Sequence, residues 1–178
     1  HDLRHHMTFL QNCIAENKRD QALEYIHQIC TDIDNSCVIK YCKNEALNLI
    51  LSSYADQAKE SGIDVRISVT ATNFTRFQIT DLCSLFANAL ENAIHACEKI
   101  PTSEKRYITL KVFEKNDRIC INIANNYIQN PVFENEIPTS REANHGIGVR
   151  SMISVVEKYH GVYGFFTENK EFRFQASL

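Results

Sequence analysis

The stretch Asn88-Ala-Leu-Glu-Asn-Ala-Ile-His-Ala-Cys97 predicts the fold around it, because it combines an apolar helical stripe with two asparagines on one helix face. Asn88 and Asn92 are four residues apart, so their carboxamides point the same way, and with His95 they form a polar ridge. We expect one long helix over about Thr80 to Ile100. Its core-facing positions recur every three or four residues and are Leu82, Phe86, Ala89, Ala93 and Cys97.

The paired asparagines are candidates for a metal site. An amide oxygen is a hard, neutral ligand that suits Mg²⁺, which keeps waters and substrate phosphates as its other ligands. We predict that Asn92 holds the metal and that Asn88 supports the metal or its waters. The alternative is that both asparagines only cap or hydrate a surface helix.

A second candidate segment is His145-Gly-Ile-Gly-Val-Arg-Ser-Met152. We expect Gly146 and Gly148 directly before a helix over about Val149 to His160. Glycines let backbone N–H groups approach an anion closely, and the helix start adds the positive end of its dipole. An ordinary loop with two glycines is the alternative. Together the two segments predict a site for a metal and a triphosphate.

Composition narrows the class of protein. The 178 residues are 44% hydrophobic and 23% charged, as in ordinary globular proteins, and the net charge is −3. No basic cluster is present, so we expect no nucleic-acid partner. The seven cysteines include no C-x-x-C pair, and five fall at apolar periodic positions, which favours reduced thiols in a cytosolic compartment. No apolar run is long enough to span a membrane.

The first 36 residues predict a helical hairpin. Leu3, Met7, Leu10 and Ile14 repeat at four-three-four spacing, and a second helix begins near Asp20. Because such a hairpin cannot bury both faces alone, we expect residues 1–36 to pair with a second copy as a four-helix bundle. Packing on the rest of the same chain is the alternative. The chain begins in mid-pattern at His1, so we expect a fragment of a longer protein.

Residues 37–178 predict an α+β domain. A helix over Asn44 to Ser61 leads to an alternating strand over Ile63 to Thr70, and two hairpins follow later, over 107–124 and 162–178. We expect one mostly antiparallel sheet with helices on one face. Residues from about 126 to 145 lack periodicity and contain two prolines, so we expect a disordered segment or a lid over the site.

Three motifs in this order resemble the sensor histidine kinases, whose catalytic domain belongs to the GHKL ATP-binding superfamily. His1-Asp-Leu-Arg-His5 resembles the H box, Asn88-x-x-x-Asn92-Ala the N box, and Gly146-x-Gly148 the second glycine box. The variants of these motifs are most similar to the peptide-quorum-sensing branch of Gram-positive bacteria. The resemblance covers nearly the whole chain and implies a dimerisation hairpin followed by a GHKL-type α/β sandwich.

The resemblance also implies a reaction. His1 would accept the γ-phosphoryl group of ATP–Mg²⁺, Asp2 would hold the other ring nitrogen, and a response regulator would receive the phosphate. His5 and His6 compete for the acceptor role. His95 would donate to a phosphate or to the lid, or would simply face solvent. The chain would be the cytoplasmic part of a homodimeric sensor whose membrane portion precedes His1.

One family motif is missing. The D-x-G-x-G box, whose aspartate recognises the adenine amino group, is absent, and Ile123-Ala-Asn-Asn-Tyr127 stands in its place. An asparagine oxygen can accept the same hydrogen bond, so Asn125 is the candidate for adenine recognition. Alternatively, Asn125 and Asn126 form a turn.

Other functions compete with this one. His1-Asp-Leu-Arg-His5 also fits a helical zinc-protease pattern, although no third ligand is evident. The missing box leaves open a non-catalytic dimeric interaction module with the same fold. A serine kinase of the anti-sigma type would share the ATP domain but not the histidine-bearing hairpin. Because hydrolytic superfamily members carry Glu where Asn88 stands, the resemblance favours transfer to a side chain over hydrolysis.

Overall fold

The computed structural model describes residues 2–31, 40–139 and 145–178, and describes side chains for residues 8–25, 40–139 and 147–178. The chain divides into two compact units, His1–Ile39 and Lys40–Leu178.

The N-terminal unit is a pair of helices, as expected: α1 (Asp2–Ala15) and α2 (Arg19–Thr31). They pack through the rings of Phe9 and Tyr25, whose centroids are 4.2 Å apart. Ile14 and Leu23 remain 70% and 52% exposed, so this unit leaves apolar surface uncovered. Other expected stripe positions lie outside the residues whose side chains are described: Leu3, Met7, Ile26, Ile29, Cys30 and Ile33.

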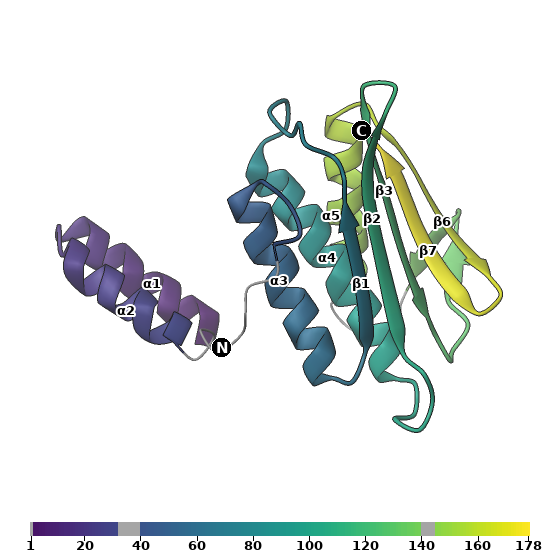
Figure 1. Ribbon diagram of the computed structural model, residues 1–178, viewed down its shortest axis with the longest axis horizontal. Helices are drawn as coiled ribbons and strands as arrows, with labels where there is room; N and C mark the ends of the chain where they lie inside the picture. Colours follow the sequence, from purple (N-terminus) through teal and green to yellow (C-terminus); the bar gives the residue numbers. More distant parts are fainter. Residues whose placement is uncertain (1, 32–39, 140–144) are drawn as a thin grey trace. The chain divides into compact units, whose positions relative to one another are not determined.

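The C-terminal unit is a two-layer α/β sandwich. Its helices are α3 (Glu45–Glu60), α4 (Ile79–Glu98) and α5 (His145–Lys158). Its main sheet is formed by β1 (Asp64–Val69), β2 (Tyr107–Lys115), β3 (Arg118–Asn126), β6 (Val162–Glu168) and β7 (Glu171–Ser177). The strand order is β1-β2-β3-β7-β6, and only the β1–β2 pair is parallel. The three helices cover one face of the sheet (Figure 1). The strand pairing and this cover confirm the expected mostly antiparallel sheet with helices on one face.

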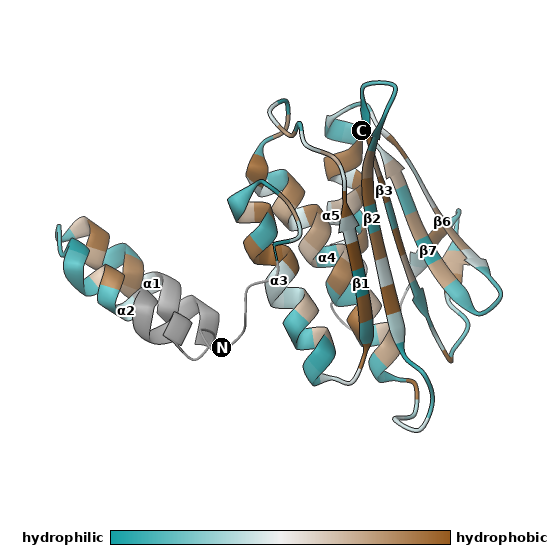
Figure 2. Ribbon diagram, in the orientation of Figure 1, coloured by the Kyte–Doolittle hydropathy of each residue, from teal (hydrophilic) through white to brown (hydrophobic). Residues whose placement is uncertain are grey.

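Local sequence explains where the helices begin and end. The side chain of Asn44 accepts a hydrogen bond from the Leu47 N–H and caps α3. Gly62, with φ of +71°, follows the end of that helix. In α4 the expected apolar stripe is buried, and Leu82, Phe86 and Cys97 have no exposed surface. Figure 2 shows hydrophobic and hydrophilic residues alternating along the helices and strands of this unit.

Two-residue turns join three hairpins. Asn116–Asp117 and Asn169–Lys170 have positive φ at both residues and connect β2 to β3 and β6 to β7. Such turns match the twist of the strands they join. Asn135–Glu136 has the same conformation and connects β4 (Val132–Glu134) to β5 (Ile137–Thr139).

The structure corrects two sequence expectations. Part of the segment expected to be disordered or a lid is ordered as the β4–β5 hairpin, so disorder is wrong for this part, and the lid stays a prediction. Residues 140–144 of the segment lie outside the described chain. Helix α5 begins at His145 rather than Val149, so Gly146 and Gly148 lie in its first turn and not before it. The first N–H groups of a helix have no intrahelical partner, so those at the start of α5 can donate to a ligand.

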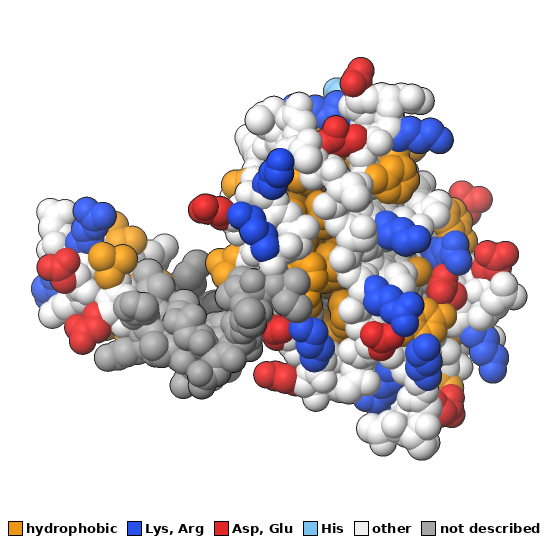
Figure 3. Space-filling model, in the orientation of Figure 1, with side chains coloured by type: hydrophobic (Ala, Val, Ile, Leu, Met, Phe, Trp, Pro, Cys, Tyr) orange, Lys and Arg blue, Asp and Glu red, His pale blue; other side chains and the backbone are white. Residues whose placement is uncertain are grey.

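The surface carries charges of both signs. On the face of the C-terminal unit seen in Figure 3, basic and acidic side chains are interspersed with apolar atoms. Within the described part of the chain, no helix is both long and apolar enough to cross a bilayer.

Candidate functional site

A cavity of about 350 Å³ lies where the C-terminal half of α4 meets the ends of the central strands. Asn92 and Asn125 both line it, from α4 and β3 respectively. The segment that contains the β4–β5 hairpin supplies further lining residues: Gln129, Asn130, Pro131, Val132, Pro138 and Thr139. Asn92, expected to bind the metal, and Asn125, expected to bind the adenine base, therefore line the same cavity.

Asn88 lies on α4 one turn before Asn92, is not part of the cavity lining, and has a fixed orientation. Its Nδ2 donates to the carbonyl oxygen of Ser84 at 2.7 Å and lies 3.3 Å from the Ser84 and Ser151 hydroxyls. These contacts leave the carboxamide oxygen directed toward Gly148. A Cβ at Gly148 would stand only 3.0 Å from Asn88 Oδ1 and 3.7 Å from Asn92 Nδ2. The asparagine ridge and the glycine-bearing turn are therefore in direct contact.

Asn92 is also held at its nitrogen. Its Nδ2 lies 3.8 Å from the Met152 sulfur of α5, a weak acceptor. The carbonyl end of the carboxamide is left for a ligand in the cavity. An amide oxygen is a suitable ligand for Mg²⁺, whereas a soft metal would favour sulfur or imidazole. Among the side chains that the structure describes, no cluster of three or more His, Cys, Asp or Glu could hold a metal.

Asn125 is almost completely buried, with 2% of its surface exposed, in the central strand β3. Its Nδ2 donates to the carbonyl oxygen of Asn126 at 2.9 Å, and no hydrogen bond to its Oδ1 is present among the described residues. The residue lies within the β2–β3–β7 ladder. The sequence alternative of a turn at Asn125 and Asn126 was therefore wrong.

Several predicted residues are not brought to the cavity within the described structure. His95 is half-buried on α4 and does not line the cavity. His1 lies outside the described residues, as do the side chain of Asp2 and the surroundings of Gly146. Any relation between the acceptor histidine and the cavity remains a prediction.

Sequence reasoning missed the apolar floor of the cavity. Phe172 and Phe174 alternate along β7, and Phe165 of β6 lies against both, with ring centroids 6.2 and 5.0 Å away. Met152 and Val149 add apolar atoms from α5. The alternation of Phe172 and Phe174 was a visible signal of a strand with one buried face. A floor of this kind suits a flat aromatic base.

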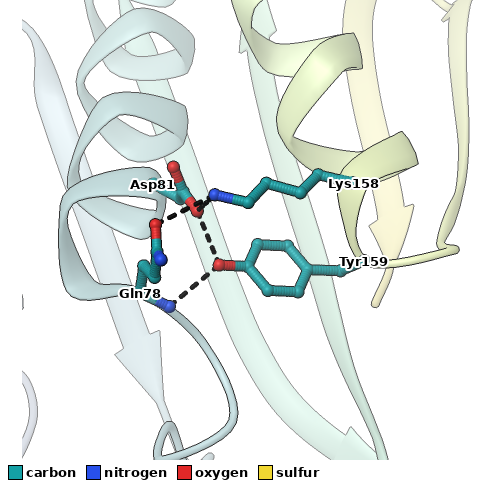
Figure 4. Close-up of polar contacts among 4 residues, drawn as sticks. All are labelled: Gln78, Asp81, Lys158 and Tyr159. Carbon is teal, nitrogen blue, oxygen red and sulfur yellow. Dashed lines mark hydrogen bonds and ion pairs between the residues drawn. The ribbon is translucent and has the colours of Figure 1, made fainter.

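Sequence reasoning also missed the polar contacts that hold α4 against α5 (Figure 4). Tyr159 donates from its hydroxyl to Asp81 Oδ2 at 2.5 Å and accepts from the Gln78 N–H at 2.8 Å. Lys158 donates to Asp81 Oδ2 at 2.7 Å and to Gln78 Oε1 at 2.9 Å. The bonds from Lys158 and Tyr159 hold the pKa of Asp81 below its usual value. These contacts fix the two helices that carry Asn88, Asn92 and Gly148.

The sequence profile of the GHKL domain matches residues 77–178, more than half of the chain. The chain belongs to the GHKL domain family. The match begins just before α4 and runs to the end of β7, so it contains the whole cavity. A search of curated protein sequences finds no match.

Several solved histidine kinase structures have a fold similar to that of this chain. The nucleotide-free catalytic domain of histidine kinase ThkA is 14% identical, with a TM-score of 0.60, and the alignment covers 76% of this chain and 91% of that one. The mycobacterial sensor histidine kinase MprB is 13% identical, with a TM-score of 0.55 over 75% and 91%. Acinetobacter baumannii histidine kinase AdeS is 9% identical, with a TM-score of 0.57 over 100% and 96%. At these identities the likeness concerns the fold.

Proposed function

We propose that this chain is the ATP-binding and phosphoacceptor region of a sensor histidine kinase, transferring the γ-phosphoryl group of ATP to His1. The observation that carries the proposal is the shared cavity. Asn92 and Asn125 line it from different elements, and Gly148 stands against the asparagine ridge beside it. The similar folds of histidine kinase catalytic domains support the proposal.

The base would enter between Asn125 and the phenylalanine floor. Adenine presents an exocyclic amino group, and the oxygen of Asn125 is left to accept its hydrogen bond because the amide nitrogen is used by Asn126. The rings of Phe165 and Phe174 supply the apolar surface that a purine requires. This arrangement replaces the missing D-x-G-x-G box with an uncharged acceptor.

The triphosphate would extend toward Asn92 and the start of α5. Asn92 would hold Mg²⁺ through its oxygen, with Asn88 supporting the metal or its waters, and the bound metal would neutralise phosphate charge. The backbone N–H groups around Gly146 and Gly148 would donate to phosphate oxygens, helped by the helix dipole. His95 stays a proposed donor to a phosphate or to the lid.

Transfer requires a side-chain acceptor because the site offers no general base for water at position 88. The carboxamide of Asn88 cannot accept a proton at neutral pH. An imidazole nitrogen of His1 would attack the γ-phosphorus, so the P–N bond forms as the bond to the bridging oxygen breaks. Asp2 would accept a hydrogen bond from the other ring nitrogen and stabilise the charge that develops.

The resemblance of the motifs at His1, Asn88 and Gly146 supports a proposed biological setting. We place the chain in the peptide-quorum-sensing branch of Gram-positive bacteria, as the cytoplasmic part of a homodimer whose membrane-embedded sensor precedes His1. A response regulator would accept the phosphate on an aspartate.

Labelling tests this function. The chain incubated with Mg²⁺ and γ-labelled ATP should acquire an acid-labile, alkali-stable label, as expected for phosphohistidine. His1→Gln should abolish the label while leaving nucleotide binding intact, and His5→Gln serves as its matched control. Asn92→Ala should remove the Mg²⁺ dependence of ATP binding.

Other outcomes would contradict parts of the proposal. A His1→Gln chain that labels as well as wild type would exclude His1 as the acceptor. A wild-type chain that binds ATP–Mg²⁺ as a dimer without labelling would identify a non-catalytic interaction module.

A further inference from the structure

The side chain of Asn126 extends the contact between β2 and β3 beyond the end of their ladder. The register of the two strands stops at the pair of Ile108 with Asn125. Beyond it, Asn126 Oδ1 accepts from the Tyr107 N–H at 2.9 Å, and its Nδ2 donates to the Lys105 carbonyl at 2.7 Å. Asn126 is paired with Glu171 in the β3–β7 ladder, and its two side-chain bonds tie the same residue to the segment on the β2 side.

The buried thiol of Cys97 adds a third connection. Its sulfur lies 3.6 Å from both the carbonyl oxygen and the Oδ1 of Asn126, and 3.5 Å from the Tyr107 carbonyl. Burial raises the pKa of this thiol to about 11, so it stays protonated and remains a donor. Cys97 lies on α4, the helix that carries Asn92. The same helix is thus bonded to the strand end that carries Asn125.

These bonds and the β3–β7 ladder together hold the carbonyl oxygen of Asn126 where it accepts a hydrogen bond from the Asn125 amide nitrogen. A flipped Asn125 carboxamide would place its Oδ1 2.9 Å from that carbonyl, where two acceptors would meet without a proton. The flip is therefore disfavoured, and the Asn125 oxygen is directed to the ligand. Asn126 does not line the cavity itself.

We propose that Asn126 is a positioning residue that fixes the orientation of the Asn125 carboxamide and thereby makes the site selective for 6-aminopurines over 6-oxopurines. The inference rests on the proposed role of Asn125 in binding adenine. An acceptor oxygen matches the amino group of adenine and opposes the carbonyl of hypoxanthine or guanine. An asparagine free to flip would offer its NH₂ group to the 6-oxo base instead, and the discrimination would fall.

Dissociation constants for Mg²⁺-ATP and Mg²⁺-ITP test this proposal, because inosine differs from adenosine at this edge of the base. The wild-type chain should bind ATP at least about tenfold more tightly than ITP, as expected for a site built around one hydrogen bond. Asn126→Ala should lower that ratio by about fivefold or more, partly by strengthening ITP binding. Asn122→Ala is the matched control, since Asn122 lies on the same strand with its Oδ1 unpartnered, and it should keep the wild-type ratio.

The ratio of ATP to ITP affinity distinguishes a positioning role of Asn126 from a general structural role. A variant that merely loosens the fold would weaken both nucleotides equally, and an unchanged ratio in a folded Asn126→Ala chain overturns the proposal. If that variant does not fold, Asn126→Asp replaces it, because it keeps an acceptor for Tyr107 and loses the donor to Lys105. It should give an intermediate ratio, and the wild-type ratio would contradict the proposal.

Asn125→Ala distinguishes this inference from the function it rests on. Loss of discrimination in Asn125→Ala, with full discrimination in Asn126→Ala, leaves adenine recognition standing and excludes the role of Asn126. A wild-type chain that binds ATP and ITP equally overturns both.

Discussion

At the scale of single residues, the site contains three asparagines whose side-chain nitrogens already contact other protein atoms. Asn88 donates to Ser84 and Ser151, Asn92 lies with its nitrogen near Met152, and Asn125 donates to Asn126. An asparagine carries one acceptor and one donor end of nearly equal size, so its neighbours decide which end meets a ligand. In each case the carboxamide oxygen remains available to a ligand, and such an oxygen suits a cation or an amino group.

Gly148→Ala should weaken nucleotide binding without weakening the fold. The new Cβ would lie 3.0 Å from Asn88 Oδ1, so the asparagine would have to shift. Overpacking of this kind costs about 1–3 kcal/mol, which corresponds to roughly five- to 150-fold in affinity if it falls on the bound state. Alanine also favours the helix by about 1 kcal/mol, so the free energy of unfolding should change little. Calorimetric titration with Mg²⁺-ATP and chemical unfolding measure the two effects.

Gly62→Ala is the control for that substitution. Gly62 has φ of +71° and open space where a Cβ would lie, so alanine would be strained by its backbone alone. It should lower the free energy of unfolding by about 1 kcal/mol and leave the nucleotide affinity at the wild-type value. Equal effects of both alanines on binding would contradict the role of Gly148.

Cys97 should resist alkylation in the folded protein across the neutral range. The thiolate is the reactive form, and burial raises the pKa of Cys97 to about 11, so almost no thiolate exists below about pH 9. Cys83 and Cys120 are only partly buried and provide internal controls. Site-resolved mass spectrometry after iodoacetamide treatment should find these two modified before Cys97. Rapid native-state modification of Cys97 would contradict the tight packing of the α4 end.

At the scale of elements, the packing of α4 against α5 determines the site, because each helix contributes one side of the contact between the asparagines and Gly148. Apolar side chains bury the interface, and the cluster of Gln78, Asp81, Lys158 and Tyr159 fixes its far end. The alignment of the two helices should therefore depend on Asp81.

Asp81→Asn should destabilise the fold at neutral pH and reduce its sensitivity to acid. Bonds from Lys158 and Tyr159 lower the pKa of the folded carboxyl below the unfolded value of about 3.9. A lowered pKa means that the stabilisation is fully present above about pH 4 and is lost as the pH falls through the folded pKa. The stability difference between wild type and Asp81→Asn should therefore shrink below about pH 4. Urea unfolding at several pH values measures it, and a constant difference would contradict this assignment.

Elements with long periodic patterns could be predicted from sequence, whereas short or locally constrained ones could not. The α4 stripe extends over about five turns, so its buried face was evident from Leu82 to Cys97. The three-residue strands β4 and β5 carry too little periodicity, and Pro138 suggested a loop, although Asn135 was a turn signal. The site asparagines were visible as residue types. Their orientations were not, because these depend on Ser151, Met152 and Asn126 from other elements or from the folded strand end.

At the scale of the whole molecule, the chain consists of two units with different tasks in the proposed reaction. The C-terminal unit contains the cavity and a continuous core, whereas the N-terminal unit carries His1 and leaves Ile14 and Leu23 exposed. A helical pair with exposed apolar positions is incomplete as a folded unit and favours association. We therefore expect the N-terminal unit to mediate dimerisation.

Residues 40–178 alone should bind Mg²⁺-ATP with the affinity of the full chain but remain monomeric and unlabelled. All described lining residues of the cavity belong to this part, so deletion of residues 1–39 should leave the site intact. The full chain should be a dimer. The double variant Ile14→Asp with Leu23→Asp should shift it toward monomer, since a charge at the buried centre of a bundle is strongly unfavourable. Light scattering and nucleotide titration measure both properties.

A matched variant on the other unit controls for the added charge. Leu49 is 68% exposed on α3, so Leu49→Asp introduces the same charge and should leave the dimer unchanged. A truncated chain that still dimerises, or a double variant that stays dimeric, would assign association to the C-terminal unit. A truncated chain that folds but no longer binds nucleotide would mean that the cavity requires the hairpin, which would contradict the division of tasks between the two units.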